Sequence, residues 1–317
     1  MSNQIATVNS NSPAIPANVA AFVADSRAEN TKRAYRSDWA AFSGYCSGLG
    51  LVALPAAPDT VARYIADMAG VAKVSTISRR VASISTAHKI AGLPSPCKSE
   101  LVLSTLKGIK RSLTVAQVKK QPVRVRNLRA GFETLGDSPA DIRNRALLLI
   151  GYAGGFRRSE LVALNMADIE RAPEGLIITV RRSKTDQQGQ GLRKGIPYGS
   201  NPATCPVRAF GAWADLVGET DGAIFRRIRK GGVLTSERLT DKTVADVIKA
   251  MAPAMGLVAA DVSGHSMRSG FVTDAYASGA PEAAIMATTG HRSHAVMQGY
   301  RREANIFKQN AAAMVGL

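Results

Sequence analysis

Cysteine is scarce in this sequence. The three cysteines, Cys46, Cys97 and Cys205, are odd in number and far apart, which excludes a disulfide framework and zinc-finger spacing and favours a reducing compartment. Long apolar runs are also missing, because the best candidate, around Ala146–Tyr152, stops at a glycine pair well short of membrane-spanning length. The N-terminus has no basic residue before Arg27 and no apolar segment. We therefore expect no signal peptide, no membrane contact and a cytoplasmic protein.

Acidic residues are in short supply as well. There are 24 Asp and Glu against 41 Lys and Arg, which gives a formal net charge of +17. This excess favours a polyanionic partner, most simply nucleic acid, although a basic but otherwise ordinary enzyme would share it. Hydrophobic residues occupy 45% of the 317 positions, which is enough to bury a core, and the length suits two domains.

The N-terminal part of the chain is predicted to be helical. Residues 1–14 are rich in Ser, Asn, Pro and Ala and are interpreted as a flexible arm. In the segment 15–115, apolar residues recur at helical spacing, which predicts an all-helical bundle. The expected helices cover 30–46, about 60–68, 75–91 and 99–112. His88, on the third of them, is interpreted as a packed core residue.

A polar, basic stretch that ends at a proline, residues 116–124, is typical of an interdomain linker. The segment 125–317 mixes helices with a few strands. Ser138 and Pro139 are typical first residues of a helix, and the run 176–180 is rich in β-formers. A partner strand is expected near Ile196, and further helices after Arg157, Pro206, Thr240 and His265 and from about Glu303 onward. The predicted fold class is mainly α with a small β-sheet.

Three short clusters carry candidate functional residues. They are G-F-R-R-S-E-L at 155–161, S-G-H-S-M-R-S-G at 263–270 and G-H-R-S-H-A-V-M-Q-G-Y at 290–300, with R-R-S-K-T at 181–185 between the first two. Taken singly, each has an ordinary explanation: a solvated helix start, a surface His–Arg pair, an exposed lysine or a packed tyrosine. His291 and His294 are three residues apart and would suit a metal, but no Cys, Asp or Glu lies close by to complete such a site.

Together, the clusters contain every residue type that cleavage of a phosphodiester by a protein hydroxyl requires. Two arginines can grip phosphoryl oxygens, a histidine can move a proton near neutral pH, and a lysine can reach the leaving oxygen. A tyrosine can attack, and we expect neighbouring cations to make its hydroxyl more acidic. No cluster of carboxylates indicates Mg²⁺, so we expect no metal and no other cofactor.

The order Arg, Lys, His-x-x-Arg, His, Tyr resembles that of the tyrosine recombinases, the phage integrase family, and the helical N-terminal half is most similar to Cre-like members. The resemblance covers about residues 17–317. It implies a site made of Arg157 with the supporting carboxylate Glu160, Lys184, His265, Arg268, His291 and the nucleophile Tyr300. It also implies a two-domain clamp on duplex DNA, with an N-terminal helical core-binding (SAM-like) bundle and a C-terminal mixed α/β catalytic domain.

The resemblance further implies a reaction without metal or ATP. Tyr300 would form a 3′-phosphotyrosine while both arginines and His291 hold the phosphate. His265 would help to move the tyrosine proton, and Lys184 would protonate the departing 5′ oxygen. A type IB topoisomerase would share this chemistry, and a non-catalytic DNA-binding protein is the alternative from another class.

The segment 304–317 carries an approximate helical apolar stripe, made of Ile306, Phe307, Ala311, Met314 and Val315. The resemblance implies that such a helix docks on a neighbouring protomer, although it could also dock on its own domain. We therefore expect a monomer in the absence of DNA and a homotetramer on two double-stranded DNA sites. The resemblance also implies a bacterial, phage or plasmid setting and association with the nucleoid. The target sequence and any accessory proteins are not readable from these residues.

Overall fold

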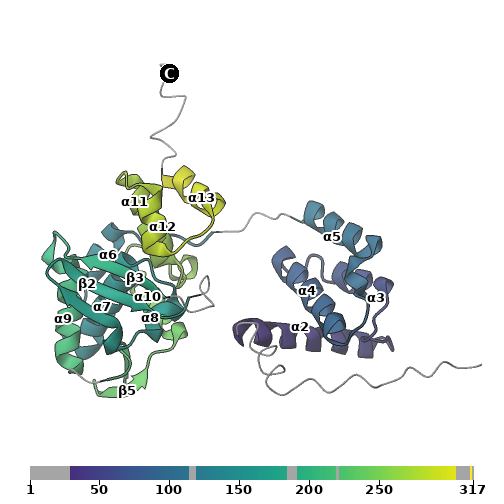
Figure 1. The fold of residues 1–317 in the computed structure, drawn as a ribbon, viewed down its shortest axis with the longest axis horizontal. Coiled ribbons are helices and arrows are strands. Elements are labelled where there is room, and N and C mark those ends of the chain that lie inside the picture. Colours follow the sequence, from purple (N-terminus) through teal and green to yellow (C-terminus); the bar gives the residue numbers. More distant parts are fainter. Residues whose placement is uncertain (1–28, 114–118, 184–190, 219–220, 305–314, 316–317) are drawn as a thin grey trace, which may run out of the picture. The chain divides into compact units, whose positions relative to one another are not determined.

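The structure is a computed structural model that describes residues 29–113, 119–183, 191–218, 221–304 and 315. The chain divides into two compact units, Met1–Val118 and Lys119–Leu317, each with its own hydrophobic core (Figure 1). Most described residues are helical and the strands are short, which confirms the predicted fold class. No helix within these ranges is both long and apolar enough to cross a membrane.

Among its described residues, the first unit is a bundle of four α-helices. The predicted helices are all present, with ends within two residues of those expected: α2 (Glu29–Gly48), α3 (Pro58–Asp67), α4 (Val74–Ile90), the 3-10 turn η1 (Pro96–Lys98) and α5 (Glu100–Ser112). Helix α2 packs on α4, and α3 packs on α5. His88 is fully buried, and its Nε2 accepts from the Ala56 N–H at 2.9 Å while Nδ1 bonds the Ile84 carbonyl. The packing role predicted for His88 is thus confirmed.

The second unit surrounds a central helix with further helices and two small sheets. Its elements are α6 (Val125–Phe132), α7 (Pro139–Ala153), α8 (Arg158–Ala163), η2 (Met166–Asp168), β1 (Ile169–Ala172), β2 (Gly175–Val180), β3 (Leu192–Pro197), η3 (Pro202–Thr204), α9 (Pro206–Val217), β4 (Arg226–Ile228), β5 (Leu234–Arg238), α10 (Asp241–Met251), η4 (Ala259–Asp261), α11 (Ser266–Ala277), α12 (Glu282–Thr289) and α13 (His294–Ala304). Ser138 caps α7 by accepting from the Asp141 N–H, as its sequence predicted. The run Ala146–Ile150 is buried all round the helix, so α7 forms the centre of the core.

The larger sheet has the order β1-β2-β3 with antiparallel neighbours, and β4 pairs with β5 separately. The predicted strand 176–180 and its partner near Ile196 are confirmed as β2 and β3. The sequence did not predict β1, β4, β5, α6 or α12, and it placed the start of the last helix near Glu303, whereas α13 begins at His294. Strand β1 is only four residues long and reads I-E-R-A, too short and too charged to show the period of a half-buried strand.

Residues 119–125, which we call the strap, run along α11. Val123 in the middle of the strap is fully buried, and its N–H donates to the Ser266 carbonyl at 2.9 Å. The predicted linker 116–124 therefore extends too far, because its second half is packed into the second unit. That half is polar and basic apart from Val123, so its composition did not indicate that it is anchored in the core.

Asp274 fixes the end of the strap. Its carboxylate accepts from Arg124 Nε at 2.5 Å and from the Val125 N–H at 2.8 Å. The Tyr152 hydroxyl donates to the same carboxylate, and the Tyr152 ring packs edge-on against Phe271. The strap, α7 and α11 therefore meet at one partly buried carboxylate, which holds α11, the helix that carries Arg268, against the strap.

Gly270 is the place where the strap and α11 come closest. A Cβ at this position would lie 1.8 Å from the Val123 carbonyl oxygen, so the backbone of one of them must move. We expect Gly270→Ala to lower the free energy of unfolding of the second unit by about 1–3 kcal/mol, the usual cost of overpacking. Urea unfolding measures this change.

Gly211→Ala is the matched control. Gly211 lies inside α9, where an added Cβ meets nothing within 4 Å, so the substitution is expected to stabilise by roughly 0.5–1 kcal/mol through helix propensity. Equal effects of the two substitutions would show that the strap is not held against α11 in solution.

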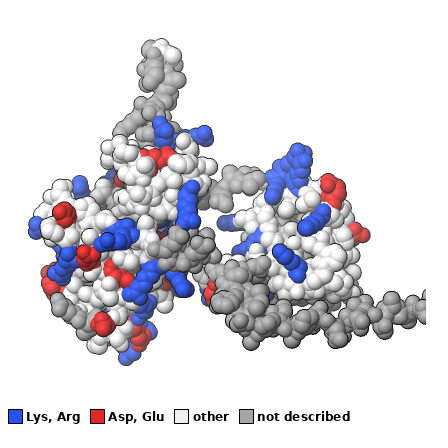
Figure 2. All heavy atoms as spheres, viewed as in Figure 1, with Lys and Arg blue, Asp and Glu red and all other residues white. Residues whose placement is uncertain are grey.

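Basic side chains are spread over both units. Figure 2 shows Lys and Arg on the described surface of each unit in this view, with fewer Asp and Glu. The first 124 residues hold 16 Lys and Arg against 6 Asp and Glu, so +10 of the net +17 belongs to that part of the chain. Each unit thus offers its own cations to a polyanion.

Candidate active site

The first predicted arginine is held in place by a carboxylate on the same helix. Arg157 is the N-cap of α8, its N–H donates to Glu160 Oε2 at 3.0 Å, and its Nη1 donates to Glu160 Oε1 at 2.5 Å. Glu160 is almost completely buried, whereas the Arg157 side chain keeps 19% of its surface exposed. Arg158 points elsewhere and pairs with Asp241. Glu160 therefore orients Arg157 and leaves part of its guanidinium free to bind an anion.

The second arginine, Arg268 on α11, is only 1% exposed. Its Nη1 donates to the carbonyls of Gly155 and Thr289, both at 2.6 Å. Its Nε and Nη2 are also buried and have no hydrogen-bond partner among the described residues. Burial, with repulsion from Arg157 second, lowers the pKa of Arg268 to about 10, so the side chain is still charged at neutral pH. Two buried, unsatisfied N–H donors on a cation are costly, and an anion would satisfy both.

His291 follows the left-handed cap of α12 at Gly290 (φ +70°). The Thr289 hydroxyl donates its one proton to the Ile285 carbonyl, so His291 Nδ1 must donate to Thr289 Oγ1, 2.7 Å away. Burial, together with the nearby cations, lowers the pKa of His291 to about 4. In the absence of an anion His291 is therefore neutral and presents the lone pair of Nε2.

Tyr300, on α13, lies beside both predicted histidines. Its hydroxyl is 3.3 Å from His265 Nε2, and its ring centroid is 6.2 Å from that of His291. Burial raises the pKa of Tyr300, and this effect is larger than the opposite effect of Arg268. The expectation that neighbouring cations make the hydroxyl more acidic is therefore wrong for the protein without DNA. A base must take the proton, and His265 is within reach of it.

Lys184 lies outside the described residues. The strands that lead to it are described: Val180 at the end of β2 pairs with Leu192 at the start of β3. A Cβ at Gly290 would be 3.3 Å from the Leu192 side chain. The base of this hairpin is thus next to the residue that precedes His291.

Two residues of the site were missed from the sequence. Thr289 fixes the tautomer of His291, and Lys194 on β3 donates from Nζ to the Gly154 carbonyl at 2.7 Å. Thr289 has no signal in a single sequence. The position of Lys194 could have been noticed in the sequence, because Lys194 is two residues before Ile196 and therefore falls on the same, buried face of the predicted strand.

The suggested pairing of His291 and His294 around a metal is not formed. His294 is exposed, and its Nδ1 bonds Glu282 Oε1 at 2.7 Å, while His291 bonds Thr289. Within the described ranges no group of three His, Cys, Asp or Glu side chains could hold a metal ion.

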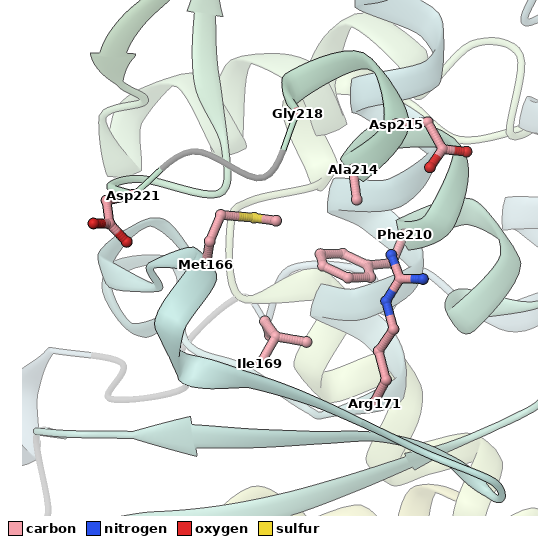
Figure 3. A pocket seen from close by; sticks show the side chains of 8 residues that line it. All are labelled: Met166, Ile169, Arg171, Phe210, Ala214, Asp215, Gly218 and Asp221. Carbon is pink, nitrogen blue, oxygen red and sulfur yellow. The ribbon is translucent and has the colours of Figure 1, made fainter.

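A hollow of about 630 Å³ opens elsewhere on the second unit (Figure 3). The side chains of Phe210 and Arg171 lie on one side of it and Asp221 on the other. Its described lining contains none of the residues discussed above: Met166, Ile169, Arg171, Phe210, Ala214, Asp215, Gly218 and Asp221. The candidate chemistry is therefore concentrated around Tyr300.

Fold and site together define a class of protein: a basic, mainly helical enzyme equipped to transfer a phosphodiester to a tyrosine hydroxyl. The model of the phage integrase family matches residues 123–305, and the chain belongs to this family. It is a site-specific tyrosine recombinase.

Relatives of known name support the assignment. The chain is 38% identical to an integrase/recombinase XerD homologue of Selenomonas ruminantium over 290 residues, which are 90% of this chain and 85% of the relative. It is 26% identical to the Cre recombinase of Escherichia phage P1 over 95% of both chains.

Solved structures share the fold. The Tn1549 transposon integrase in complex with transposon right end DNA has a TM-score of 0.64 at 15% identity and covers 90% of this chain and 96% of its own. A lambda integrase dimer bound to a core site has a TM-score of 0.61 at 17% identity, covering 89% and 92%.

Proposed function

We propose that Tyr300 is the nucleophile of this recombinase and that Arg157, Arg268 and His291 hold the scissile phosphate. The observation that carries the proposal is Arg268, whose Nε and Nη2 are buried and unpartnered among the described residues, in a site that also holds Tyr300. A phosphoryl oxygen is the acceptor that fits a buried guanidinium. The anion would also offset the cations that depress the His291 pKa, so that Nε2 can gain a proton and donate to the phosphate.

The proposed step exchanges one phosphoester bond for another. The Tyr300 oxygen bonds to phosphorus, the bond from phosphorus to the 5′ oxygen breaks, and a 3′-phosphotyrosine remains. His265 accepts the tyrosine proton, which the 3.3 Å approach allows. Lys184 supplies a proton to the departing 5′ oxygen. A 5′-hydroxyl from a partner strand reverses the step, so neither ATP nor a metal takes part.

The two units have separate roles in this proposal. The helical unit, within residues 15–115, binds duplex DNA, and the second unit binds the scissile phosphate and cleaves. The lambda integrase of known structure is a dimer bound to a core site, and the Tn1549 integrase is in complex with transposon end DNA. A duplex target fits the positive charge on both units. We place the protein at the nucleoid, where its substrate lies.

The test is to map covalent cleavage on DNA from the replicon that carries the gene, in the presence of EDTA. We expect a protein–DNA adduct at fixed positions after denaturation, and recombination between two copies of the mapped site. Relaxation of any supercoiled plasmid without fixed positions would indicate a topoisomerase. DNA binding without any adduct would indicate a non-catalytic protein.

We also propose that the protein is a monomer alone and a homotetramer at two paired DNA sites. The predicted helix 304–317 lies almost entirely outside the described residues, and its apolar stripe is the sequence feature that supports exchange between protomers. Deletion of 304–317 is expected to leave a folded protein that binds one half-site and loses cooperative assembly and recombination. Native mass measurements on DNA complexes follow the assembly. Unfolding of the truncated monomer would mean that the segment packs on its own domain.

A further inference from the structure

Lys194 is an unusual residue for the interior of this unit. It lies in the middle of β3, opposite Ile178 of β2, and is only 3% exposed. Its Nζ donates to the Gly154 carbonyl at 2.7 Å and lies 4.4 Å from the centroid of the Phe156 ring. None of the described carboxylates is within salt-bridge distance of it. A lysine so placed buries its charge without an ion pair, which costs stability.

Lys194 interacts electrostatically with the residues of the candidate active site. Burial is the main cause that lowers its pKa, to about 8, and Arg268 and Arg157 lower it further while Glu160 opposes them. Lys194 in turn helps to lower the pKa of His291. Three cations thus face one carboxylate, and the cluster carries an excess positive charge while no anion is bound.

The geometry connects Lys194 to the arginines through one tight turn. Lys194 bonds the carbonyl of Gly154, and Arg268 bonds the carbonyl of the next residue, Gly155. The turn leaves no room for a side chain at position 154, because a Cβ at Gly154 would be 2.1 Å from the Phe156 ring. The two cations therefore hold successive carbonyls of the segment that leads directly into Arg157.

We propose that Lys194 is a positioning residue of the recombination reaction: it fixes the turn that places Arg157 and Arg268, and it adds a buried positive charge behind the scissile phosphate. This inference rests on the proposed function of that site. A methionine would fill the same space without the cost of a buried charge, so packing alone does not account for a lysine. Lys194 does not touch the phosphate and is distinct from Lys184, the residue proposed to protonate the leaving oxygen.

If Lys194 has this role, the rate of DNA cleavage follows the charge of Lys194 as the pH changes. Below a pKa of about 8 Lys194 is charged, and above it the charge is lost. Cleavage at sub-saturating DNA reports on the free protein, so its rate is expected to fall as the pH rises past about 8. A bound phosphate stabilises the charged form, so with saturating DNA the fall is expected at higher pH.

The charged or titratable groups that face Lys194 are Glu160 and Arg157 of α8, Arg268 of α11 and His291 after α12. Of these, His291 has a pKa of about 4 and Arg268 of about 10, so neither accounts for a fall that begins near pH 8. Variants at position 194 test whether Lys194 is the group whose loss of charge causes this fall in rate.

The experiment measures single-turnover cleavage from pH 6.5 to 9.5 for the full-length protein and three variants. Lys194→Met is expected to cleave about 10- to 100-fold more slowly at pH 7, the scale of a misplaced catalytic group, and to show no fall near pH 8. Lys194→Arg keeps its charge throughout and is expected to retain more of its neutral-pH rate at pH 9 than the wild type does. Arg193→Met removes an exposed cation from the same strand and is expected to keep the wild-type fall.

Either of two results would overturn the proposal: a wild-type profile without a fall above pH 8, or the same fall in Lys194→Met. If neither the wild type nor any variant forms an adduct, the proposed function itself has failed. Thermal unfolding at several pH values then tests whether Lys194 is buried with a lowered pKa. Lys194 has a pKa below its ordinary value of 10.5, so between about pH 8 and 10.5 the unfolded chain binds more protons. The wild type is therefore expected to gain stability relative to Lys194→Met over that range, and parallel curves would refute a buried charged lysine.

Discussion

Tyr300→Phe is expected to bind its DNA site with wild-type affinity and to form no covalent adduct. The substitution keeps the ring, which packs with the helix pair α11 and α13, and removes only the oxygen that faces His265. Since many cations on both units are available to bind phosphate, loss of one neutral hydroxyl is expected to change affinity little. Denaturing gel electrophoresis of DNA cleavage reactions measures the adduct, and an electrophoretic mobility shift measures binding.

Tyr276→Phe is the matched control for this experiment. Tyr276 lies on α11, and its hydroxyl donates to Glu282 at 2.7 Å rather than to a residue of the proposed phosphate site. The control is expected to form the adduct. Adduct formation by Tyr300→Phe at the wild-type level would mean that another tyrosine attacks, and Tyr152, hydrogen-bonded to Asp274, would be the next residue to test.

The motifs were enough to predict the candidate site residues, because the residues within each motif are close in sequence and their relative positions follow from local helix geometry. The helix start at Arg157 places Glu160 one turn later, where its carboxylate reaches back to the arginine, and this arrangement is local. His265 and Arg268 are likewise three residues apart at the start of α11. A pattern confined to one turn of helix is legible in a single sequence.

What could not be predicted depends on contacts between distant segments. The strap looked like a linker because its residues are polar, and its burial follows from the close approach of Val123 to Gly270, far along the chain. Lys194 likewise bonds the carbonyl of Gly154, which lies 40 residues earlier in the chain. No spacing rule connects such residues before the chain is folded.

The acidity of Tyr300 shows the same limit. The sequence shows arginines and a tyrosine that meet, and from charge alone the hydroxyl should become more acidic. Burial of the hydroxyl acts in the opposite direction and is the larger effect in the protein without DNA. How deeply a group is buried is a property of the packed structure, so the sign of this shift was beyond the sequence.

Arg268→Lys is expected to reduce the rate of DNA cleavage by about 10²–10³-fold, the usual effect of losing a donor to a developing charge. Lysine keeps an N–H that can reach one of the two carbonyls now bound by Nη1, so α11 stays connected either to the turn at Gly155 or to the end of α12 at Thr289. It has no counterpart of Nε and Nη2, the two donors that have no acceptor among the described residues. The substitution therefore removes the proposed phosphate contacts with less damage to the fold than alanine would cause.

Arg268→Lys is also expected to lower the positive charge at position 268, which adds a pH dependence to the prediction. The surroundings lower the pKa of the arginine to about 10, and the ordinary pKa of a lysine, 10.5, is already lower than that of an arginine. The same burial and the same neighbouring cations would bring a lysine at this site towards neutrality near physiological pH. The Arg268→Lys defect should therefore become smaller as the pH is lowered from 8.5 to 6.5, whereas Arg158→Lys, at the neighbouring arginine that pairs with Asp241, should show neither the defect nor the trend. Single-turnover cleavage at sub-saturating DNA measures both, and a rate within threefold of the wild type would remove Arg268 from the proposed phosphate site.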